Sequence, residues 1–162
     1  MIKNVINQLE IRVIESTDKV VKFDFFIDNL ELDKMLNIDR LSDMRFCDFD
    51  LDIFKVDDQK FPNYNRLDSV KSTVDVFLGN TKPTNQFLTD RIVLYRCHCG
   101  CDYCGVISFK IDFDQTYVYW SEIRFELDDE SQTDGVKSIE RLWFDKIQYV
   151  EGFKNFRNRY CV

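Results

Sequence analysis

The stretch GVISFKIDFDQTYVYWSEIRFEL, residues 105–127, decides the fold class of this chain. Its first half alternates apolar and polar side chains with the period of two that is typical of a half-buried strand. Asp114-Gln115-Thr116 suits a tight connection, and the second half is again rich in β-branched and aromatic residues. The stretch therefore predicts an antiparallel hairpin. The apolar face of its first arm is formed by Ile107, Phe109, Ile111 and Phe113.

Further elements are predicted on both sides of this hairpin. Alternation of apolar and polar residues predicts a half-buried strand over 21–28, with Asp24 on its polar face. The apolar run at 92–95 predicts a strand buried on both faces. The segment IERLWF at 139–144 is also strand-like. Residues 29–37 have the spacing of a short helix. The segment 66–80 fits either a helix or a strand, and both interpretations stay open.

The C-terminal segment 145–160 predicts an amphipathic helix. Asp145 and Gln148 form a capping-box-like start, and apolar residues recur along one side with helical spacing. The chain of 162 residues has the length of one domain, 1–162. We therefore expect a single α+β domain, built mainly from an antiparallel sheet of four to six strands with the C-terminal helix packed on one face.

Acidic residues recur beside apolar ones in the segment FCDFDLDIF, residues 46–54. If this segment is a strand, one of its faces is a row of carboxylates and the other belongs to the core. Similar acids occur just after it and on the hairpin. The candidate partner-binding residues are Asp48, Asp50, Asp52, Asp57, Asp58, Asp112 and Asp114. They favour a docking surface for a basic partner, although charges of this kind also serve solubility alone.

The charge balance narrows the class of partner. The chain carries 29 Asp and Glu against 22 Lys and Arg, a formal net charge of -7. This balance argues against nucleic acid and anionic membranes as partners and favours a basic protein surface. The N-terminus lacks the apolar run of a secretory signal, and the sequence has no apolar stretch of membrane-spanning length. We therefore expect a cytoplasmic protein.

Four of the six cysteines lie close together in RCHCGCDYCG, residues 96–105. They are the candidate metal ligands, namely Cys97, Cys99, Cys101 and Cys104. Zinc takes four thiolate or imidazole ligands, and His98 is a possible fifth group. While the preceding strand continues, Cys97, Cys99 and Cys101 share one face. Two other interpretations stay open: reduced thiols that are simply packed, and a redox pair formed by the C-x-x-C spacing of Cys101 and Cys104.

Catalytic machinery is not evident in the sequence. His98 is the single histidine, and no nucleophile elbow, P-loop, dinucleotide fingerprint or H-E-x-x-H motif occurs. We therefore expect a protein that is not an enzyme and has no small-molecule substrate. We expect no cofactor, with zinc at the cysteine cluster as the alternative.

The region 90–156 resembles a group of small bacterial proteins without an assigned activity. The shared features are a Tyr-x-Cys strand, a C-x-x-C-G-D-x-x-C-G turn, a strand ending in V-x-W and an F-x-F-D-x-x-Q-Y corner from strand to helix. They fall on Tyr95, Cys97, Cys99, Gly100, Asp102, Cys104, Gly105, Val118, Trp120, Trp143, Phe144, Asp145, Gln148 and Tyr149. The chain departs from the pattern by a turn one residue shorter, an additional Cys101, and Trp143 in place of Phe.

In its general character the chain is also similar to immunity proteins of bacterial contact-dependent growth inhibition. Such proteins are small, cytosolic and usually acidic, and they cover the active site of a basic toxin, typically a nuclease. The resemblance implies tight one-to-one binding to a cognate toxin, with carboxylates standing in for nucleic-acid phosphates or pairing with catalytic cations. The cysteine cluster leaves a second function open, that of a small zinc-binding or thiol-active protein.

Overall fold

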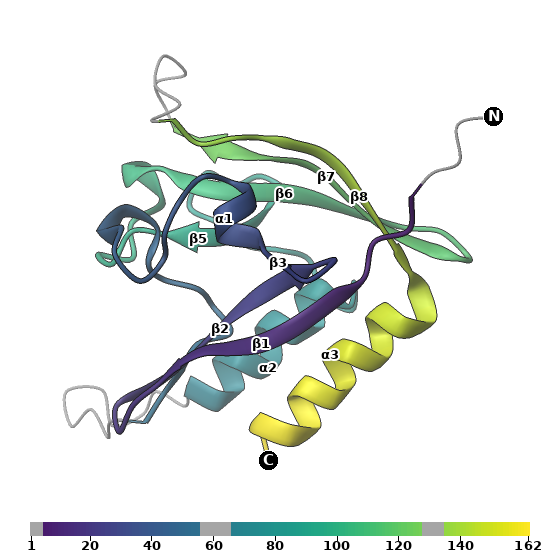
Figure 1. Cartoon of the computed structure of the whole chain (residues 1–162), viewed down its shortest axis with the longest axis horizontal. Coiled ribbons are helices and arrows are strands. Elements are labelled where there is room, and N and C mark those ends of the chain that lie inside the picture. The colour runs from purple at the N-terminus through teal and green to yellow at the C-terminus, as the bar shows by residue number, and fades with distance from the viewer. Residues whose placement is uncertain (1–4, 56–65, 128–134) are drawn as a thin grey trace.

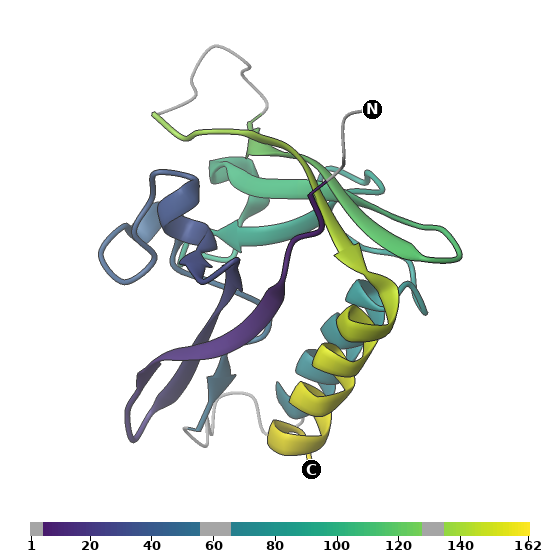
Figure 2. The same cartoon turned by 45° about the vertical axis from the view of Figure 1, so that its right-hand side comes forward.

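The computed structural model describes residues 5–55, 66–127 and 135–162, which form two four-stranded antiparallel sheets with helices packed against them. Figures 1 and 2 show the two sheets one above the other, with the two long helices below the hairpin sheet. The α+β class is confirmed. The strands form two sheets, one around the predicted hairpin and one from strands in the N-terminal part of the chain.

The hairpin sheet is the more regular of the two, with strand order β5-β6-β7-β8. Its strands are β5 (Ile92–Arg96), β6 (Val106–Phe113), β7 (Tyr117–Glu126) and β8 (Ile139–Asp145). The predicted hairpin is β6 and β7, in which Ile111 lies opposite Trp120 and Phe113 opposite Val118. The strands predicted at 92–95 and 139–144 are β5 and β8, so all four strands were visible in the sequence.

The second sheet is built around one long strand, β2, that pairs with three others. Its strands are β1 (Leu9–Ser16), β2 (Val20–Ile27), β3 (Leu30–Glu31) and β4 (Ile53–Phe54). The strand predicted at 21–28 is confirmed as β2, whereas β1 was not predicted. The expectation that Asp24 lies on an exposed polar face is wrong, because its side chain is fully buried.

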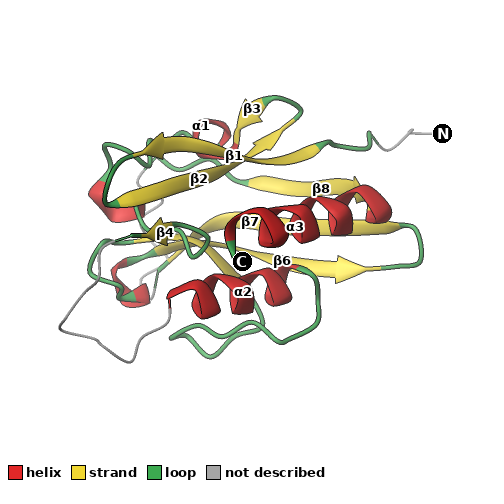
Figure 3. Cartoon of the chain, turned by 90° about the horizontal axis from the view of Figure 1, so that it is seen from below, coloured by secondary structure: helices red, strands yellow, loops and turns green. Residues whose placement is uncertain are grey.

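The two long helices lie together, whereas the short helix packs against β2 and β3 (Figure 3). They are α1 (Leu32–Met35), α2 (Arg66–Phe77) and α3 (Lys146–Tyr160), with two 3-10 turns, η1 (Met44–Phe46) and η2 (Asp102–Cys104). The ambiguous segment is therefore the helix α2. The start of α3 is capped as predicted, since the Gln148 amide donates to Asp145 Oδ1 at 3.0 Å. Figure 3 shows α2 and α3 side by side, and α3 contacts strands of both sheets.

Aromatic side chains fill the space between the layers. Trp120 of β7 lies at the centre, with ring contacts to Phe25, Phe109 and other aromatic residues of both sheets and of α2 and α3. The indole N–H of Trp120 donates to the Tyr149 hydroxyl at 3.1 Å, and that hydroxyl donates to the Phe77 carbonyl oxygen at 2.9 Å. The helices are thereby tied to the sheet by hydrogen bonds as well as by apolar contact.

Candidate functional site

The cysteine cluster lies on the loop between β5 and β6, where the strand stops. β5 ends at Arg96, and the chain turns so that the Gly100 amide donates to the Cys97 carbonyl oxygen at 2.9 Å. Gly100 has a φ of 73°, a conformation that glycine adopts without strain. The extended strand therefore ends before the cysteines, and the alternation of side chains that would have placed Cys97, Cys99 and Cys101 on one face does not apply to them.

The turn brings together three of the four predicted ligands. The sulfur atoms of Cys97, Cys99 and Cys104 all lie within 4.8 Å of one another. Cys99 and Cys104 are in contact, with their sulfurs 3.5 Å apart. Cys101 is outside this group, so the two residues with the C-x-x-C spacing, Cys101 and Cys104, are not both members of it. We call Cys97, Cys99 and Cys104 the thiol cluster.

Histidine lies next to the thiol cluster. The Nδ1 atom of His98 is 3.5 Å from the Cys97 sulfur and 3.3 Å from the Met44 carbonyl oxygen. The His98 amide also donates to the Met44 carbonyl oxygen, at 3.2 Å. The imidazole is therefore held beside the cysteines by the η1 turn, although sequence spacing alone pointed it away from Cys97.

Two thiols of the cluster differ in acidity. The pKa of Cys99 is lowered because the backbone amide of Cys101 and the neighbouring thiols donate to its thiolate. The pKa of Cys104 is raised to about 12, chiefly because its thiol donates to Cys99. The Cys99 sulfur is therefore favoured as the hydrogen-bond acceptor and the Cys104 thiol as the donor. This is the arrangement of a pair that shares a proton.

Side chains outside the loop fix its position. Gln86 is the main anchor: its amide group donates to the Gly100 carbonyl oxygen at 2.9 Å and accepts from the Asp102 amide at 2.8 Å. Asp102 is buried and in turn accepts from the Gln86 backbone amide at 2.9 Å. Arg96 lies on the other side, with its Nε 3.5 Å from Asp102 Oδ1. The thiol cluster, of which Cys99 and Cys104 are exposed and Cys97 is partly buried, is thus carried on a backbone that these contacts hold in place.

The acidic segment 46–54 is not a single strand, so the predicted row of three exposed carboxylates is wrong. Only a bridge at Asp48 and the short strand β4 are extended, with a turn between them. Asp48 pairs with Arg96 through two backbone hydrogen bonds of 3.0 Å. Asp50 is ion-paired with Arg96 at 3.1 Å and keeps 39% of its side chain exposed. Burial raises the pKa of Asp50, and the Arg96 charge opposes that rise.

Asp52 points into the protein instead of toward solvent. Its carboxylate is paired with Arg40, and it also accepts from the Phe23 amide at 3.0 Å. Burial raises the pKa of Asp52 to about 6, against the opposing effect of Arg40. This carboxylate is therefore used inside the fold, and Asp52 is removed from the candidate partner-binding residues.

Arg40 is the centre of a buried charge cluster that the sequence did not reveal. Its guanidinium donates to the carbonyl oxygens of Phe23 and Cys47 as well as to Asp52. Asp24 accepts from the Tyr95 hydroxyl and, at 2.7 Å, from the Phe25 amide. Burial raises the pKa of Asp24 to about 7, while Arg40 opposes the rise. We call Arg40, Asp52, Asp24 and Tyr95 the Arg40 cluster.

Two of the remaining predicted acids, Asp112 and Asp114, lie away from the acidic segment. Asp112 and Asp114 are exposed at the β6–β7 turn, and Figures 1 and 2 place that turn at the opposite end of the molecule from η1 and β5. Asp114 is used locally, since its Oδ1 accepts from the amides of Thr116 and Tyr117 at 2.7 and 2.6 Å. Asp57 and Asp58 lie outside the described residues.

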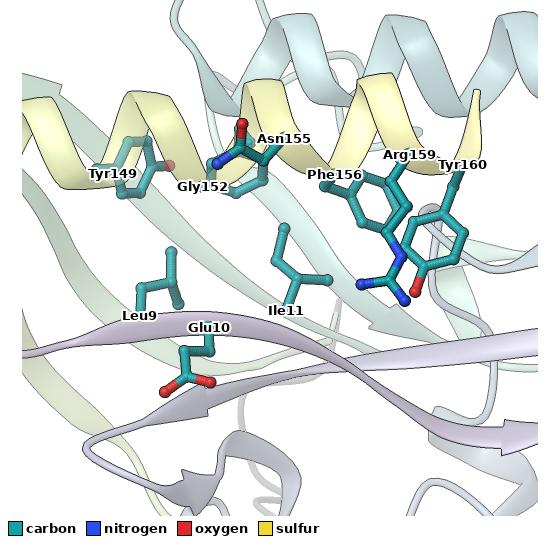
Figure 4. Close-up of a pocket in the computed structure, with 10 residues that line it drawn as sticks. Leu9, Glu10, Ile11, Tyr149, Gly152, Asn155, Phe156, Arg159 and Tyr160 are labelled. Atoms are coloured by element: carbon teal, nitrogen blue, oxygen red, sulfur yellow. The ribbon is translucent and has the colours of Figure 1, made fainter. Parts of the chain in front are cut away.

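Two of the hollows on the described surface border the elements named above. One of about 550 Å³ lies between the acidic segment, α2 and the thiol loop, and its lining includes Asp48, Asp50, Arg96 and Gly100. The other, of about 250 Å³, lies between β1 and α3, where Leu9 and Ile11 face the helix (Figure 4). The first hollow borders the loop that carries the thiols, so the acids and the cysteines occupy neighbouring surface.

Comparisons with protein-family models, curated proteins and solved structures find no match for this chain. Within residues 5–55, 66–127 and 135–162, none of the helices is both long enough and apolar enough to cross a lipid bilayer.

Proposed function

We propose that this protein binds a zinc ion through the thiol cluster and that the metal stabilises the loop between β5 and β6. The observation that carries the proposal is the convergence of the Cys97, Cys99 and Cys104 sulfurs to within 4.8 Å of one another. With Zn–S bonds of about 2.3 Å, two ligands of a tetrahedral zinc are about 3.8 Å apart. The Cys99 and Cys104 sulfurs, at 3.5 Å, already lie near that separation.

His98 is the candidate for the fourth ligand, although it lies outside the group of three and would have to turn its ring from the Met44 carbonyl oxygen toward the other two sulfurs. A tetrahedral site that joins a thiolate and an imidazole separates the sulfur and the nitrogen by about 3.5 Å. The distance from Cys97 Sγ to His98 Nδ1 is 3.5 Å. Soft thiolates together with imidazole suit zinc better than magnesium or calcium, whose preferred ligands are oxygens. This donor set therefore favours zinc among the common divalent ions.

Zinc titration of the metal-free full-length protein tests the proposal. We expect one zinc per chain, and zinc at roughly a thousand times its Kd should raise the free energy of unfolding by about 4 kcal/mol. Cys97→Ser, Cys99→Ser and Cys104→Ser should each weaken binding strongly, and His98→Asn should weaken it less. Cys101→Ser is the matched control and should bind as the wild type does. A zinc content far below one per chain would overturn the proposal.

A second candidate function is that of a bacterial immunity protein that neutralises a basic toxin domain one to one in the cytoplasm, without enzymatic activity. The hollow lined by Asp48 and Asp50 favours it, because a Lys or Arg side chain of a partner entering there would meet Asp48 and would compete with Arg96 for Asp50. The net charge of -7 adds a general attraction toward a basic partner.

This second candidate is tested with the toxin encoded by a neighbouring gene. Asp48→Lys together with Asp50→Lys should slow association with the purified toxin domain and reduce the dependence of the rate on salt. Asp112→Lys, at the other end of the molecule, is the control and should leave the rate close to that of the wild type. Consistent absence of a toxin gene beside this one, or unchanged binding by the double variant, would contradict the proposal.

A further inference from the structure

Cys99 and Cys104 of the thiol cluster are placed for a reaction with each other, apart from metal binding. Cys99 and Cys104 are both exposed, and their sulfurs are 3.5 Å apart. A disulfide bond is about 2.05 Å long, so the sulfurs need to approach by only about 1.5 Å. Cys97 is less exposed than either, and its sulfur lies beside His98.

The loop has room for that approach. Cys99 is followed by Gly100, and a Cβ added to Gly100 would meet no atom within 4 Å, so the backbone can adjust there without a clash. Cys104 is the last residue of the short η2 turn and is followed by Gly105, which packs against Phe125. The Cys99 side therefore moves more easily, while the Cys104 side is held by packing.

We propose that Cys99 and Cys104 are a peroxide-sensitive dithiol that closes to a disulfide and thereby releases the bound metal. The Cys99 sulfur attacks one oxygen of a hydroperoxide, so that an S–O bond forms, the O–O bond breaks, and the leaving oxygen departs as water with the thiol proton when the oxidant is hydrogen peroxide. The Cys104 sulfur then attacks the Cys99 sulfur. The S–S bond forms, the S–O bond breaks, and a second water leaves with the Cys104 proton.

The disulfide and the zinc ion compete for the same sulfurs. Oxidation consumes Cys99 and Cys104, two of the three thiolates in the thiol cluster, and leaves Cys97 with His98. Two adjacent ligands cannot retain zinc as four ligands do, so the metal dissociates. The release of metal rests on the zinc site proposed above, whereas the disulfide requires only the geometry of the two cysteines.

The experiment treats the full-length protein with hydrogen peroxide in two forms, metal-free and zinc-loaded. Disulfides are mapped by mass spectrometry of peptides, and released zinc is followed with a chromophoric chelator. We expect a Cys99–Cys104 disulfide in both forms, with slower formation in the zinc-loaded protein and zinc release in step with it. Cys104→Ser should stop at a sulfenic acid on Cys99 that a dimedone probe traps. Cys101→Ser, the matched control, should form the disulfide as the wild type does.

The outcomes separate the two proposals. A Cys99–Cys104 disulfide in a protein that never binds zinc overturns the zinc site and supports the dithiol. Zinc binding with no Cys99–Cys104 disulfide, or with Cys101 and Cys104 as the linked pair, overturns the dithiol and leaves the zinc site standing. Loss of the disulfide in Cys101→Ser would also overturn the assignment of the pair.

Discussion

The Arg40 cluster and the thiol cluster both lie near the end of β5, and they use their polar groups in opposite ways. Tyr95 of β5 belongs to the Arg40 cluster and is fully buried, whereas Cys97 follows just beyond the end of that strand. Arg40 donates to two backbone carbonyls and a carboxylate inside the protein. The thiols instead converge on a point at the surface where an ion can be held.

The difference shows how to separate polar groups that build a fold from those that serve a ligand. Arg40 links β2 to the segment 47–52, so its bonds determine how the acidic segment docks on the sheet that contains β2. A buried charge of this kind is tolerated because Asp52 and two backbone carbonyl oxygens pair with the two terminal nitrogens of its guanidinium. In the thiol cluster Cys99 and Cys104 are exposed and Cys97 is partly buried, and the loop is fixed by backbone and by Gln86, so two of the sulfurs stay open to a ligand.

Removing the Arg40 charge should have the largest effect on stability. Arg40→Met leaves the carboxylates of Asp52 and Asp24 buried without their cation, and breaking a buried pair in this way costs about 3–5 kcal/mol. We expect the upper end, about 5 kcal/mol, because two carboxylates are affected. Urea unfolding followed by tryptophan fluorescence measures the loss.

Arg12→Met is the matched control, because Arg12 pairs with Glu10 at 2.8 Å on the surface. An exposed pair contributes less than about 1 kcal/mol, so this variant should unfold almost as the wild type does. Similar losses in the two variants would show that Arg40 does not organise the fold and would remove the contrast between the two clusters.

The Arg40 cluster should also make stability depend on pH. The pKa of Asp24 is about 7 in the folded protein and close to 3.9 in the unfolded chain, so the folded state binds the proton more tightly. Its stabilising contribution is therefore complete below about pH 4 and is lost as the pH rises toward 7. A shift of this size corresponds to roughly 4 kcal/mol, and Asp52 acts in the same direction.

Asp24→Asn should flatten this pH dependence, since an amide does not titrate. Free energies of unfolding at pH 4.5, 6 and 7.5 would be compared for the wild type, for Asp24→Asn and for Asp112→Asn, which changes an exposed acid and should keep the wild-type slope. An Asp24→Asn variant that loses stability toward pH 7 as steeply as the wild type would assign the slope to other groups.

The local parts of this fold could be predicted from the sequence. The period of two in 105–127 and the cap at Asp145 depend on neighbours along the chain, and both are observed in the structure. β1 could also have been predicted, since Leu9, Ile11 and Val13 alternate with polar residues and lie opposite Ile27, Phe25 and Phe23. Its signal was simply weaker than that of the hairpin, with charged residues at the intervening positions.

The buried acids could not be predicted in the same way. The alternating pattern places Asp24 and Asp52 on polar faces, and only Arg40 and Tyr95, from other segments, make their burial possible. The three-thiol geometry was missed for a more local reason. Gly100 ends the extended chain, and a turn at that glycine would have pointed to Cys104 in place of Cys101 as the partner of Cys97 and Cys99.

The two glycines of the thiol loop give the smallest and most local test of the comparison. Gly105 has a φ of 103°, and a Cβ there would lie 2.6 Å from the Phe125 ring, whose other neighbour is Phe46. Gly105→Ala combines this clash with left-handed strain and should cost about 3 kcal/mol. Gly100→Ala meets only open space and should cost about 1 kcal/mol. Equal losses of unfolding free energy in the two variants would mean that the loop is packed throughout. The distinction between a packed end at Gly105 and an open end at Gly100 would then be wrong.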